Sequence, residues 1–240
     1  RVMIWDFAMA RIAERPVLRE AESHHAVKVL RLAAGGRIDI ADGAGTWYRA
    51  EITRPHPKHC EVRILEKTAA LPRPCHVHLA IAPTKNLDRL EWMLEKCVEI
   101  GLDEISFLET RYSERRVLKL ERLHGVAVSA LKQSGQGWLP NLNPLMRFRE
   151  FLEKQHCPLP TARCQLFIAH LAEGERMLLH REAVPGGRYC VLIGPEGDFS
   201  PEEIQDAQAV GFQPISLGPS RLRTETAGLV AVYALNLVNQ

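Results

Sequence analysis

Two prolines within three residues, in the segment Leu71-Pro72-Arg73-Pro74, divide the chain into parts with different hydrophobic patterns. Proline favours extended backbone and stops a neighbouring helix or strand from continuing. Before this segment the patterns are typical of short strands, and after it strand patterns alternate with helix patterns of period 3.6. A length of 240 residues suits one large domain or two modest ones. We therefore predict two domains, residues 1–71 and residues 72–240.

The first part is predicted to be a small β-barrel with one helix. An Asp-Gly turn at residues 42–43 lies between the alternating residues 38–41 and 47–52, which is typical of a hairpin. Residues 60–65 predict a further strand. Residues 22–32, with apolar side chains three and four apart, predict a short helix.

The second part has the alternation of strands and helices that is typical of an α/β domain with a largely parallel sheet. The predicted strands are residues 76–82, 104–108, 165–169 and 189–193, and the predicted helices are residues 86–100 and 115–133.

Composition excludes several classes of protein. The hydrophobic fraction of 46% and the charged fraction of 25% are those of a globular protein, not of a disordered chain. No apolar run approaches the roughly 18 residues of a membrane span, so we expect a soluble, cytoplasmic protein without a membrane partner. The six cysteines form no C-x-x-C pair. In a strand, Cys75 would point away from His76 and His78, so no metal site is predicted.

The net charge of +2 is too small to indicate a nucleic-acid-binding protein. The charge is unevenly distributed, however. Residues 1–72 contain 12 Lys and Arg against 9 Asp and Glu, whereas residues 73–240 contain 19 against 20. Contact with a polyanion is therefore expected in the first part.

Two successive strand-loop-helix units in the last third carry the strongest functional signal. In the first, the apolar residues 191–193 lead into Gly194-Pro195-Glu196-Gly197, and residues 200–203 carry the capping box of a helix start. In the second, residues 214–217 lead into the Gly-Pro loop at 218–222 and a further helix. Ligands of open α/β sheets bind beyond the carboxyl ends of the strands. We expect the two loops to form two walls of one pocket.

These motifs resemble those of a known family. Residues 192–197 and 217–227 resemble the signature of the SPOUT methyltransferases, in particular the RsmE family, which methylates N3 of a uridine in 16S (small-subunit) ribosomal RNA. The resemblance continues at residues 96–101 and 132–134, and residues 24–43 resemble the PUA-like barrel of that family.

The resemblance implies an N-terminal PUA-like β-barrel and a C-terminal SPOUT α/β domain with a trefoil knot. It also implies S-adenosylmethionine as the cofactor, small-subunit ribosomal RNA as the partner, free or in the assembled subunit, and a homodimer. A final helix at residues 229–238 that is apolar on nearly every side agrees with burial in the fold or against a second subunit.

The resemblance further implies which residues form the site. The cofactor-binding residues are predicted to be Leu192, Ile193, Gly194, Glu196, Gly197, Leu217, Gly218, Leu222, Arg223, Thr224 and Ala227. The RNA-binding residues are predicted to be His24, His25, Arg31, Lys132 and Gln133.

Methylating a uracil ring nitrogen requires an aligned methyl donor, an exposed base and an acceptor for the N3 proton. Arg223, at the start of the last helix, is the first candidate for stabilising the uracil anion. Glu225 either accepts the proton or orients Arg223, and Thr224 either bonds the base or cofactor or caps the helix. Trp47 and Trp138 either stack on bases or pack in the core.

Two other functions are weighed against this one. A nucleotide-using α/β enzyme is disfavoured because neither G-x-G-x-x-G nor G-x-x-x-x-G-K-[ST] occurs. A non-catalytic dimeric RNA-binding module is disfavoured by the glycine loops and by Arg223-Thr224-Glu225. The chain departs from the family at Asp198, where members often have Gly, and at Gly135-Gln136-Gly137-Trp138, where many carry Arg. Asp198 either restrains its loop or points to solvent.

Overall fold

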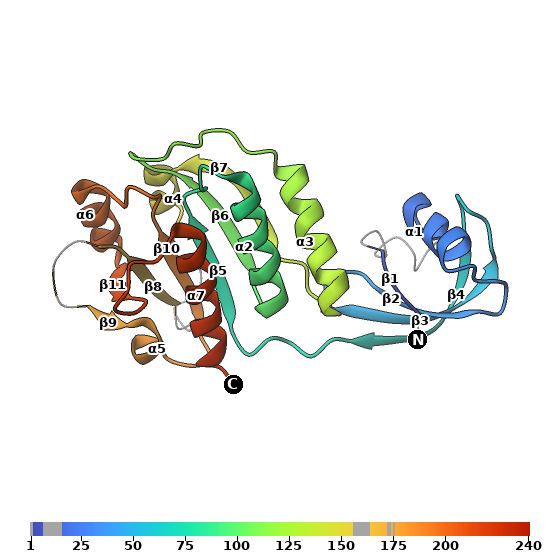
Figure 1. Cartoon of the computed structure of the whole chain (residues 1–240). Coiled ribbons are helices and arrows are strands. Elements are labelled where there is room, and N and C mark those ends of the chain that lie inside the picture. Colours follow the sequence, from blue (N-terminus) through green and yellow to red (C-terminus); the bar gives the residue numbers. More distant parts are fainter. Residues whose placement is uncertain (1, 7–15, 156–163, 172–173, 175) are drawn as a thin grey trace. The chain divides into compact units, whose positions relative to one another are not determined.

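The computed structural model describes residues 2–6, 16–155, 164–171, 174 and 176–240. The chain divides into two compact units: residues 1–72 with 131–139, and residues 73–130 with 140–240 (Figure 1). The sequence did not indicate that residues 131–139 belong with the first unit. None of the helices in the described part combines the length and the apolar character that a membrane span requires.

The first unit is built on a four-stranded sheet with the strand order β1-β2-β3-β4. Its strands are β1 (Val2–Trp5), β2 (Arg37–Ala41), β3 (Thr46–Arg54) and β4 (Glu61–Ala69). β1 runs parallel to β2, and the other neighbours are antiparallel. The predicted hairpin between β2 and β3 is confirmed. Its turn is held by Asp42, whose Oδ1 accepts hydrogen bonds from the amides of Ala44 (2.8 Å) and Thr46 (2.9 Å).

The predicted helix of the first unit is shorter than residues 22–32. α1 (Glu20–His24) continues as one π-helical turn, η2 (His25–Val29), and Arg31 then has a positive φ of 54°. The alternation of the strands brings apolar side chains to one core beneath this helix. The core comprises Ile4, Leu18, Ala26, Ile38, Ile40, Tyr48, Ala50, Ile52, Cys60 and Val62.

Residues 131–139 join the first unit through backbone bonds and aromatic packing. The amide of Leu139 donates to the Gly43 carbonyl (2.7 Å), and the Trp138 ring lies directly over Gly45. Trp47 meets Trp5 edge-on at 6.2 Å between ring centroids. Both Trp47 and Trp138 therefore take part in packing within this unit, which favours the packing interpretation over base stacking.

The second unit contains a seven-stranded sheet, and every strand pair in it is parallel. The strand order is β7-β6-β5-β10-β8-β11-β9. The strands are β5 (His76–Ile81), β6 (Glu104–Glu109), β7 (Asn141–Arg147), β8 (Cys164–Ala169), β9 (Met177–Leu178), β10 (Arg188–Ile193) and β11 (Gln213–Ser216). The predicted parallel sheet is confirmed, although β7 and β9 were not predicted.

Helices cover both faces of this sheet (Figure 1). They are α2 (Leu87–Ile100), α3 (Leu120–Ser134), α4 (Phe148–Glu153), α5 (Leu179–Glu182), α6 (Pro201–Val210) and α7 (Thr224–Leu237). Ala80 and Leu192 pack into the core formed with α4 and α6. Leu79 and Ile81 face Gly228 of α7 on the other side. The buried apolar residues 79–81 of β5 and 189–193 of β10 reflect burial of both faces of these central strands.

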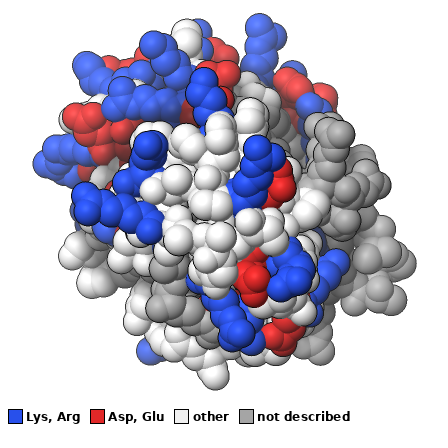
Figure 2. Space-filling model, turned by 90° about the vertical axis from the view of Figure 1, so that its right-hand side faces the viewer, with Lys and Arg blue, Asp and Glu red and all other residues white. Residues whose placement is uncertain are grey.

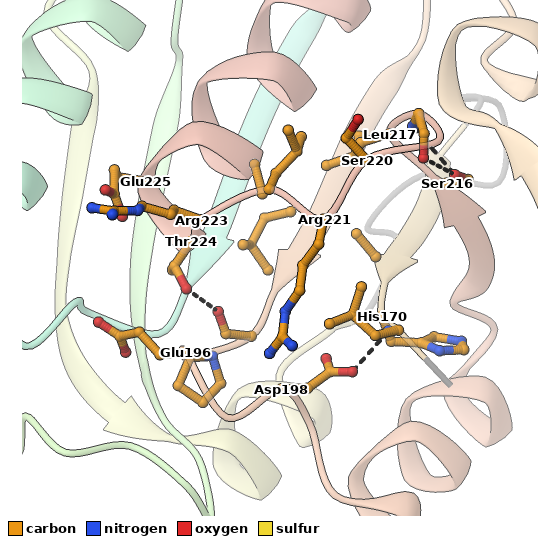
Figure 3. Close-up of a pocket in the computed structure, with 18 of the residues that line it drawn as sticks. His170, Glu196, Asp198, Ser216, Leu217, Ser220, Arg221, Arg223, Thr224 and Glu225 are labelled. Atoms are coloured by element: carbon orange, nitrogen blue, oxygen red, sulfur yellow. Dashed lines mark hydrogen bonds between the residues drawn. The ribbon is translucent and has the colours of Figure 1, made fainter. Parts of the chain in front are cut away.

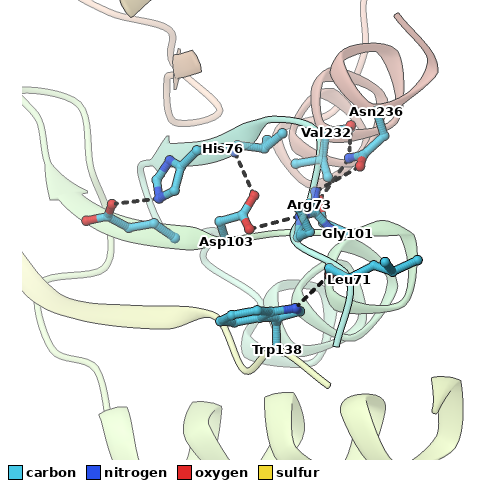
Figure 4. Close-up of polar contacts among 10 residues, drawn as sticks. Leu71, Arg73, His76, Gly101, Asp103, Trp138, Val232 and Asn236 are labelled. Atoms are coloured by element: carbon cyan, nitrogen blue, oxygen red, sulfur yellow. Dashed lines mark hydrogen bonds and ion pairs between the residues drawn. The ribbon is translucent and has the colours of Figure 1, made fainter. Parts of the chain in front are cut away.

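Polar contacts fix the end of α7 to the loop that follows α2 (Figure 4). The Asn236 side-chain amide donates to the Gly101 carbonyl at 2.8 Å, and Arg73 Nη2 donates to the same carbonyl at 3.0 Å. Arg73 also forms an ion pair with Asp103 at 2.9 Å. Asp103 Oδ2 in turn accepts from the amide of Val77, at the start of β5 (2.7 Å). These bonds fix the carboxyl-terminal end of α7, and the first turn of the helix lies at the carboxyl end of β10, where Thr224 bonds Gly194.

Candidate cofactor pocket and active site

A cavity of about 730 Å³ opens where β8, β10 and β11 end (Figure 3). The loops that follow β10 and β11 form two of its walls, together with the first turn of α7. This arrangement was expected from the two Gly-Pro loops. The volume is that of a site for a small molecule or cofactor.

The loop after β10 needs its glycines for close packing. A Cβ on Gly194 would lie 3.1 Å from the ring of Phe199, and a Cβ on Gly197 would lie 3.1 Å from Cβ of Tyr112. The loop ends in the predicted capping box of α6. Ser200 Oγ accepts from the Glu203 amide at 3.2 Å, and Glu203 Oε2 accepts from the Ser200 amide at 2.9 Å. The helix start therefore fixes the far end of this wall.

Asp198 restrains the same loop and does not simply point to solvent. Its φ is 66°, a left-handed conformation that Asp tolerates better than most residues. Its Oδ2 accepts a hydrogen bond from the Leu171 amide (2.7 Å), and its Oδ1 accepts from the Phe199 amide (2.9 Å). The side chain thus ties the loop after β10 to the end of β8.

The loop after β11 turns at Gly218, whose φ of 138° suits glycine alone among the common residues. A Cβ at Gly218 would meet no atom within 4 Å. The backbone here therefore borders open space. Thr224 Oγ1 donates to the Gly194 carbonyl at 3.2 Å and so joins the two loops across the pocket.

The three predicted catalytic residues lie together at the start of α7. Arg223 is exposed and precedes the first turn, but its side chain does not cap the helix. Glu225 is only 7% exposed, and its Oε1 lies 3.3 Å from Nη1 of Arg89 in α2. Among the described residues, the ion-pair partner of Glu225 is therefore Arg89, and no ion pair joins it to Arg223. Arg89 was not singled out from the sequence.

Nine of the predicted cofactor residues line the cavity. They are Ile193, Gly194, Glu196, Leu217, Gly218, Leu222, Arg223, Thr224 and Ala227. Leu192 and Gly197 are not among its lining residues. Successive strand residues point to opposite faces of the sheet. Ile193 borders the cavity, whereas its neighbour Leu192 packs in the core with Ala80. Gly197 packs against Tyr112 instead.

The end of β8 completes the pocket and was missed from the sequence. Ala169, His170 and Leu171 line it, because β8 lies between β10 and β11 in the sheet. Both ring nitrogens of His170 are buried and have no hydrogen-bond partner among the described residues. Burial, and secondarily the charge of Arg176, lowers the pKa of His170. The sequence does not show which strands are neighbours in the sheet, so it did not indicate that the end of β8 lines the pocket.

Comparison with known proteins identifies this arrangement. A family model described as an RNA methyltransferase domain matches residues 71–236, and a model described as an RNA methyltransferase PUA domain matches residues 18–65. The chain belongs to this RNA methyltransferase family. A similar protein is the ribosomal RNA small subunit methyltransferase E of Synechocystis. It is 33% identical over 227 residues, which cover 91% of this chain and 72% of that protein.

Solved structures of RNA methyltransferases have the same fold. A probable rRNA-methyltransferase from Porphyromonas gingivalis is 38% identical, with a TM-score of 0.89, and the match covers 100% of this chain and 98% of that one. A ribosomal RNA small subunit methyltransferase E from Neisseria gonorrhoeae, bound to S-adenosylmethionine, is 29% identical with a TM-score of 0.75; the match covers 90% of this chain and 89% of that one. The predicted RsmE family and the PUA-like and SPOUT fold class are confirmed. The trefoil knot stays a prediction.

The predicted RNA-binding residues of this methyltransferase all lie in the first unit. His24, His25, Arg31 and Gln133 are exposed. The ammonium group of Lys132 is paired with the buried Glu22 at 2.7 Å. Lys132 is thus engaged within the unit, whereas the other four side chains face solvent.

His76 and His78 share one face of the sheet, as expected from alternation. Glu104 Oε2 lies 3.8 Å from Nε2 of His76 and 3.8 Å from Nδ1 of His78. His78 Nε2 is also hydrogen-bonded to Ser106 Oγ at 2.8 Å. Burial lowers the pKa of His78 to about 4. No group of three or more His, Cys, Asp and Glu in the described ranges is arranged to hold a metal ion.

Proposed function

We propose that this methyltransferase transfers a methyl group from S-adenosylmethionine to N3 of a uridine in small-subunit ribosomal RNA. The observation that carries the proposal is the convergence of both glycine loops with Arg223, Thr224 and Glu225 on one cavity. The related Synechocystis protein is named for the small-subunit ribosomal RNA, and the Neisseria structure contains S-adenosylmethionine.

The residues around the cavity suit this cofactor. Its volume of about 730 Å³ is sufficient, and its walls combine apolar side chains such as Ile193, Leu217 and Leu222 with exposed loop backbone. At Gly218 the backbone leaves room where another residue would project its Cβ. When bound, the cofactor supplies an electrophilic methyl group. The nine predicted lining residues are those that would hold it.

Among the carboxylates of the cavity wall, we assign the N3 proton to Glu225, because it shares the first turn of α7 with Thr224 and follows Arg223. Glu196 Oε1 already accepts from the Lys85 amide at 3.0 Å, and both oxygens of Asp198 accept from backbone amides. Glu225 accepts from Arg89 through Oε1, and this bond holds the carboxylate in place. Arg223, exposed at the same helix start, stabilises the negative charge of the uracil ring. Thr224 positions the two loops, because its hydroxyl is bonded to Gly194.

The first unit supplies the RNA contact. Lys28, Arg31, Arg37 and Lys58 are exposed, and none of them forms an ion pair among the described residues. Figure 2 shows a face on which Lys and Arg side chains lie beside uncharged residues, with Asp and Glu interspersed. Exposed cations without acidic partners bind RNA phosphates through release of counterions. His24, His25 and Gln133 extend this surface.

The active form is a homodimer in the cytoplasm. Tyr233 and Leu237 of α7 are 51% and 47% exposed, and the neighbouring Leu229 and Val230 are partly exposed. These positions recur at helical spacing, so α7 presents an apolar stripe on the side away from its core contacts. A second copy of the chain would bury this stripe.

The direct test is methylation of small-subunit ribosomal RNA by the purified protein with labelled S-adenosylmethionine, followed by mapping of the modified nucleotide by mass spectrometry. We expect N3-methyluridine with the wild-type protein. We expect Arg223→Ala to abolish transfer while the variant keeps the wild-type melting temperature. Transfer to another atom would overturn the assigned substrate, and transfer by Arg223→Ala at the parental rate would overturn the assigned role of Arg223.

A further inference from the structure

Arg221 extends from one wall of the cavity towards the other. Its backbone belongs to the loop after β11, and its side chain runs to the loop after β10, where the guanidinium ends near Asp198 (Figure 3). Arg221 therefore borders the space that a ligand in the cavity would occupy.

The guanidinium of Arg221 has no hydrogen bond or ion pair within the part of the chain that the structure describes. The neighbouring acids, Asp198 and Glu196, form no ion pair with it among the described residues and are bonded to backbone amides. Asp198 accepts from the amides of Leu171 and Phe199, and Glu196 accepts from the Lys85 amide. A guanidinium with five donors beside a ligand cavity is thus available to an anion from outside the chain.

Arg89, Arg176 and Arg223 also line the cavity. Arg89 is paired with Glu225 at 3.3 Å. Arg176 lies near His170, whose pKa it secondarily lowers, and it forms no ion pair among the described residues. Arg223 lies with Glu225 on the opposite side of the cavity from Asp198 (Figure 3). In Figure 3, Arg221 extends towards the loop after β10, whereas Arg223 lies on the side of Glu225.

We propose that Arg221 recognises the methyl donor by binding the carboxylate of its methionine part, so that the site selects nucleosides that carry this carboxylate. The carboxylate is the only anionic group of S-adenosylmethionine, and the planar guanidinium matches it with two parallel hydrogen bonds. The inference rests on the proposed function only in that S-adenosylmethionine is the donor; it is independent of the RNA target.

The test is calorimetric binding of two ligands without RNA. One is S-adenosylhomocysteine, and the other is its decarboxylated analogue, S-adenosyl-3-thiopropylamine. We expect the wild-type protein to prefer S-adenosylhomocysteine by about 10- to 100-fold, as for one charged hydrogen-bonded pair. We expect Arg221→Ala to lose this preference and to bind the analogue with wild-type affinity. Arg221→Lys should keep part of the preference, since it retains the charge without the fork.

Arg176→Ala is the matched control, because Arg176 also lines the cavity and also lacks an ion pair among the described residues. It should keep the wild-type preference. An equal loss in both variants would mean that overall positive charge attracts the ligand, and would overturn the inference. So would an Arg221→Ala variant that binds S-adenosylhomocysteine normally but has a raised KM for RNA, since the anion would then be an RNA phosphate. If the wild-type protein bound neither ligand, the proposed function itself would fall.

Discussion

The carboxylate of Asp198 accepts a hydrogen bond from the backbone amide of Leu171 at 2.7 Å. Asp198 belongs to the loop after β10, and Leu171 follows the neighbouring strand β8. The bond therefore connects two walls of the cofactor cavity. Thr224 makes the corresponding connection on the other side, between the start of α7 and the loop after β10. Two side-chain hydrogen bonds thus connect the walls of the cavity.

Replacing Asp198 separates the effect of this bond from that of the backbone conformation. Asp198→Gly loses the hydrogen bonds but adopts the φ of 66° without strain, so we expect a loss of about 1 kcal/mol in the free energy of unfolding. Asp198→Ala loses the same bonds and is strained as well, so we expect a loss of about 2 kcal/mol. Urea unfolding measures both values. Equal losses in Asp198→Gly and Asp198→Ala would show that the positive φ at this position does not destabilise alanine.

The ion pair between Arg89 and Glu225 gives a second prediction. Arg89→Leu leaves a carboxylate that is 7% exposed without its cation. Because the Arg89 side chain is itself 47% exposed, we expect only about 1–2 kcal/mol of lost stability. Adding Glu225→Gln to Arg89→Leu should restore most of this loss, since no buried charge then remains. A double-mutant cycle in urea measures the coupling, and purely additive losses would show that the pair contributes nothing.

The sequence predicted the two loops of the pocket because their signals are local. A Gly-Pro step after a strand and the capping box at Ser200 act within a few residues, and both are present as predicted. Arg89 and His170 were missed for the opposite reason. They reach the cavity through the packing of α2 beside α7 and through the place of β8 between β10 and β11. The sequence patterns of α2 and β8 do not show which helix or strands lie beside them.

The helix predicted at residues 115–133 shows how tertiary contacts override a local pattern. α3 begins only at Leu120. Arg115 instead donates through Nε to the Thr84 carbonyl at 3.0 Å and through Nη2 to the Lys85 carbonyl. These bonds hold the loop after β6 against the loop after β5. Residues 115–119 therefore do not join the helix, because Arg115 bonds a loop that is distant in the sequence.

Gly45 and Gly35 form a matched pair for testing the role of Trp138. Both have nearly the same positive φ, 86° and 83°, but only a Cβ at Gly45 would enter the Trp138 ring, at 2.1 Å. At Gly35 a Cβ would meet nothing within 4 Å. We expect Gly35→Ala to cost about 1 kcal/mol from backbone strain alone.

Gly45→Ala should cost about 1–3 kcal/mol more than Gly35→Ala, because the indole must move. Thermal unfolding of the two variants compares them. Adding Trp138→Ala to each variant is the control. It should remove the extra cost at Gly45 and leave the cost at Gly35 unchanged. Equal melting temperatures for Gly45→Ala and Gly35→Ala would contradict the packing role of Trp138.

The buried imidazole of His78 predicts a pH dependence of stability. Burial lowers its pKa in the folded chain to about 4, below the value of about 6.5 in the unfolded chain. Above pH 6.5 His78 is neutral in both states and costs nothing. As the pH falls from about 6.5 to about 4, the unfolded chain takes up a proton that the folded chain does not, so this residue lowers stability by up to about 3 kcal/mol.

His78→Gln retains a group that can bond Ser106 but cannot titrate. As the pH falls from about 6.5 to about 4, the wild-type protein should therefore lose unfolding free energy relative to this variant. Urea unfolding at several pH values measures that difference, and an NMR titration of the imidazole should place its midpoint near pH 4. A difference that does not change between pH 6.5 and 4 would show that water or Glu104 accommodates the protonated ring in the folded chain.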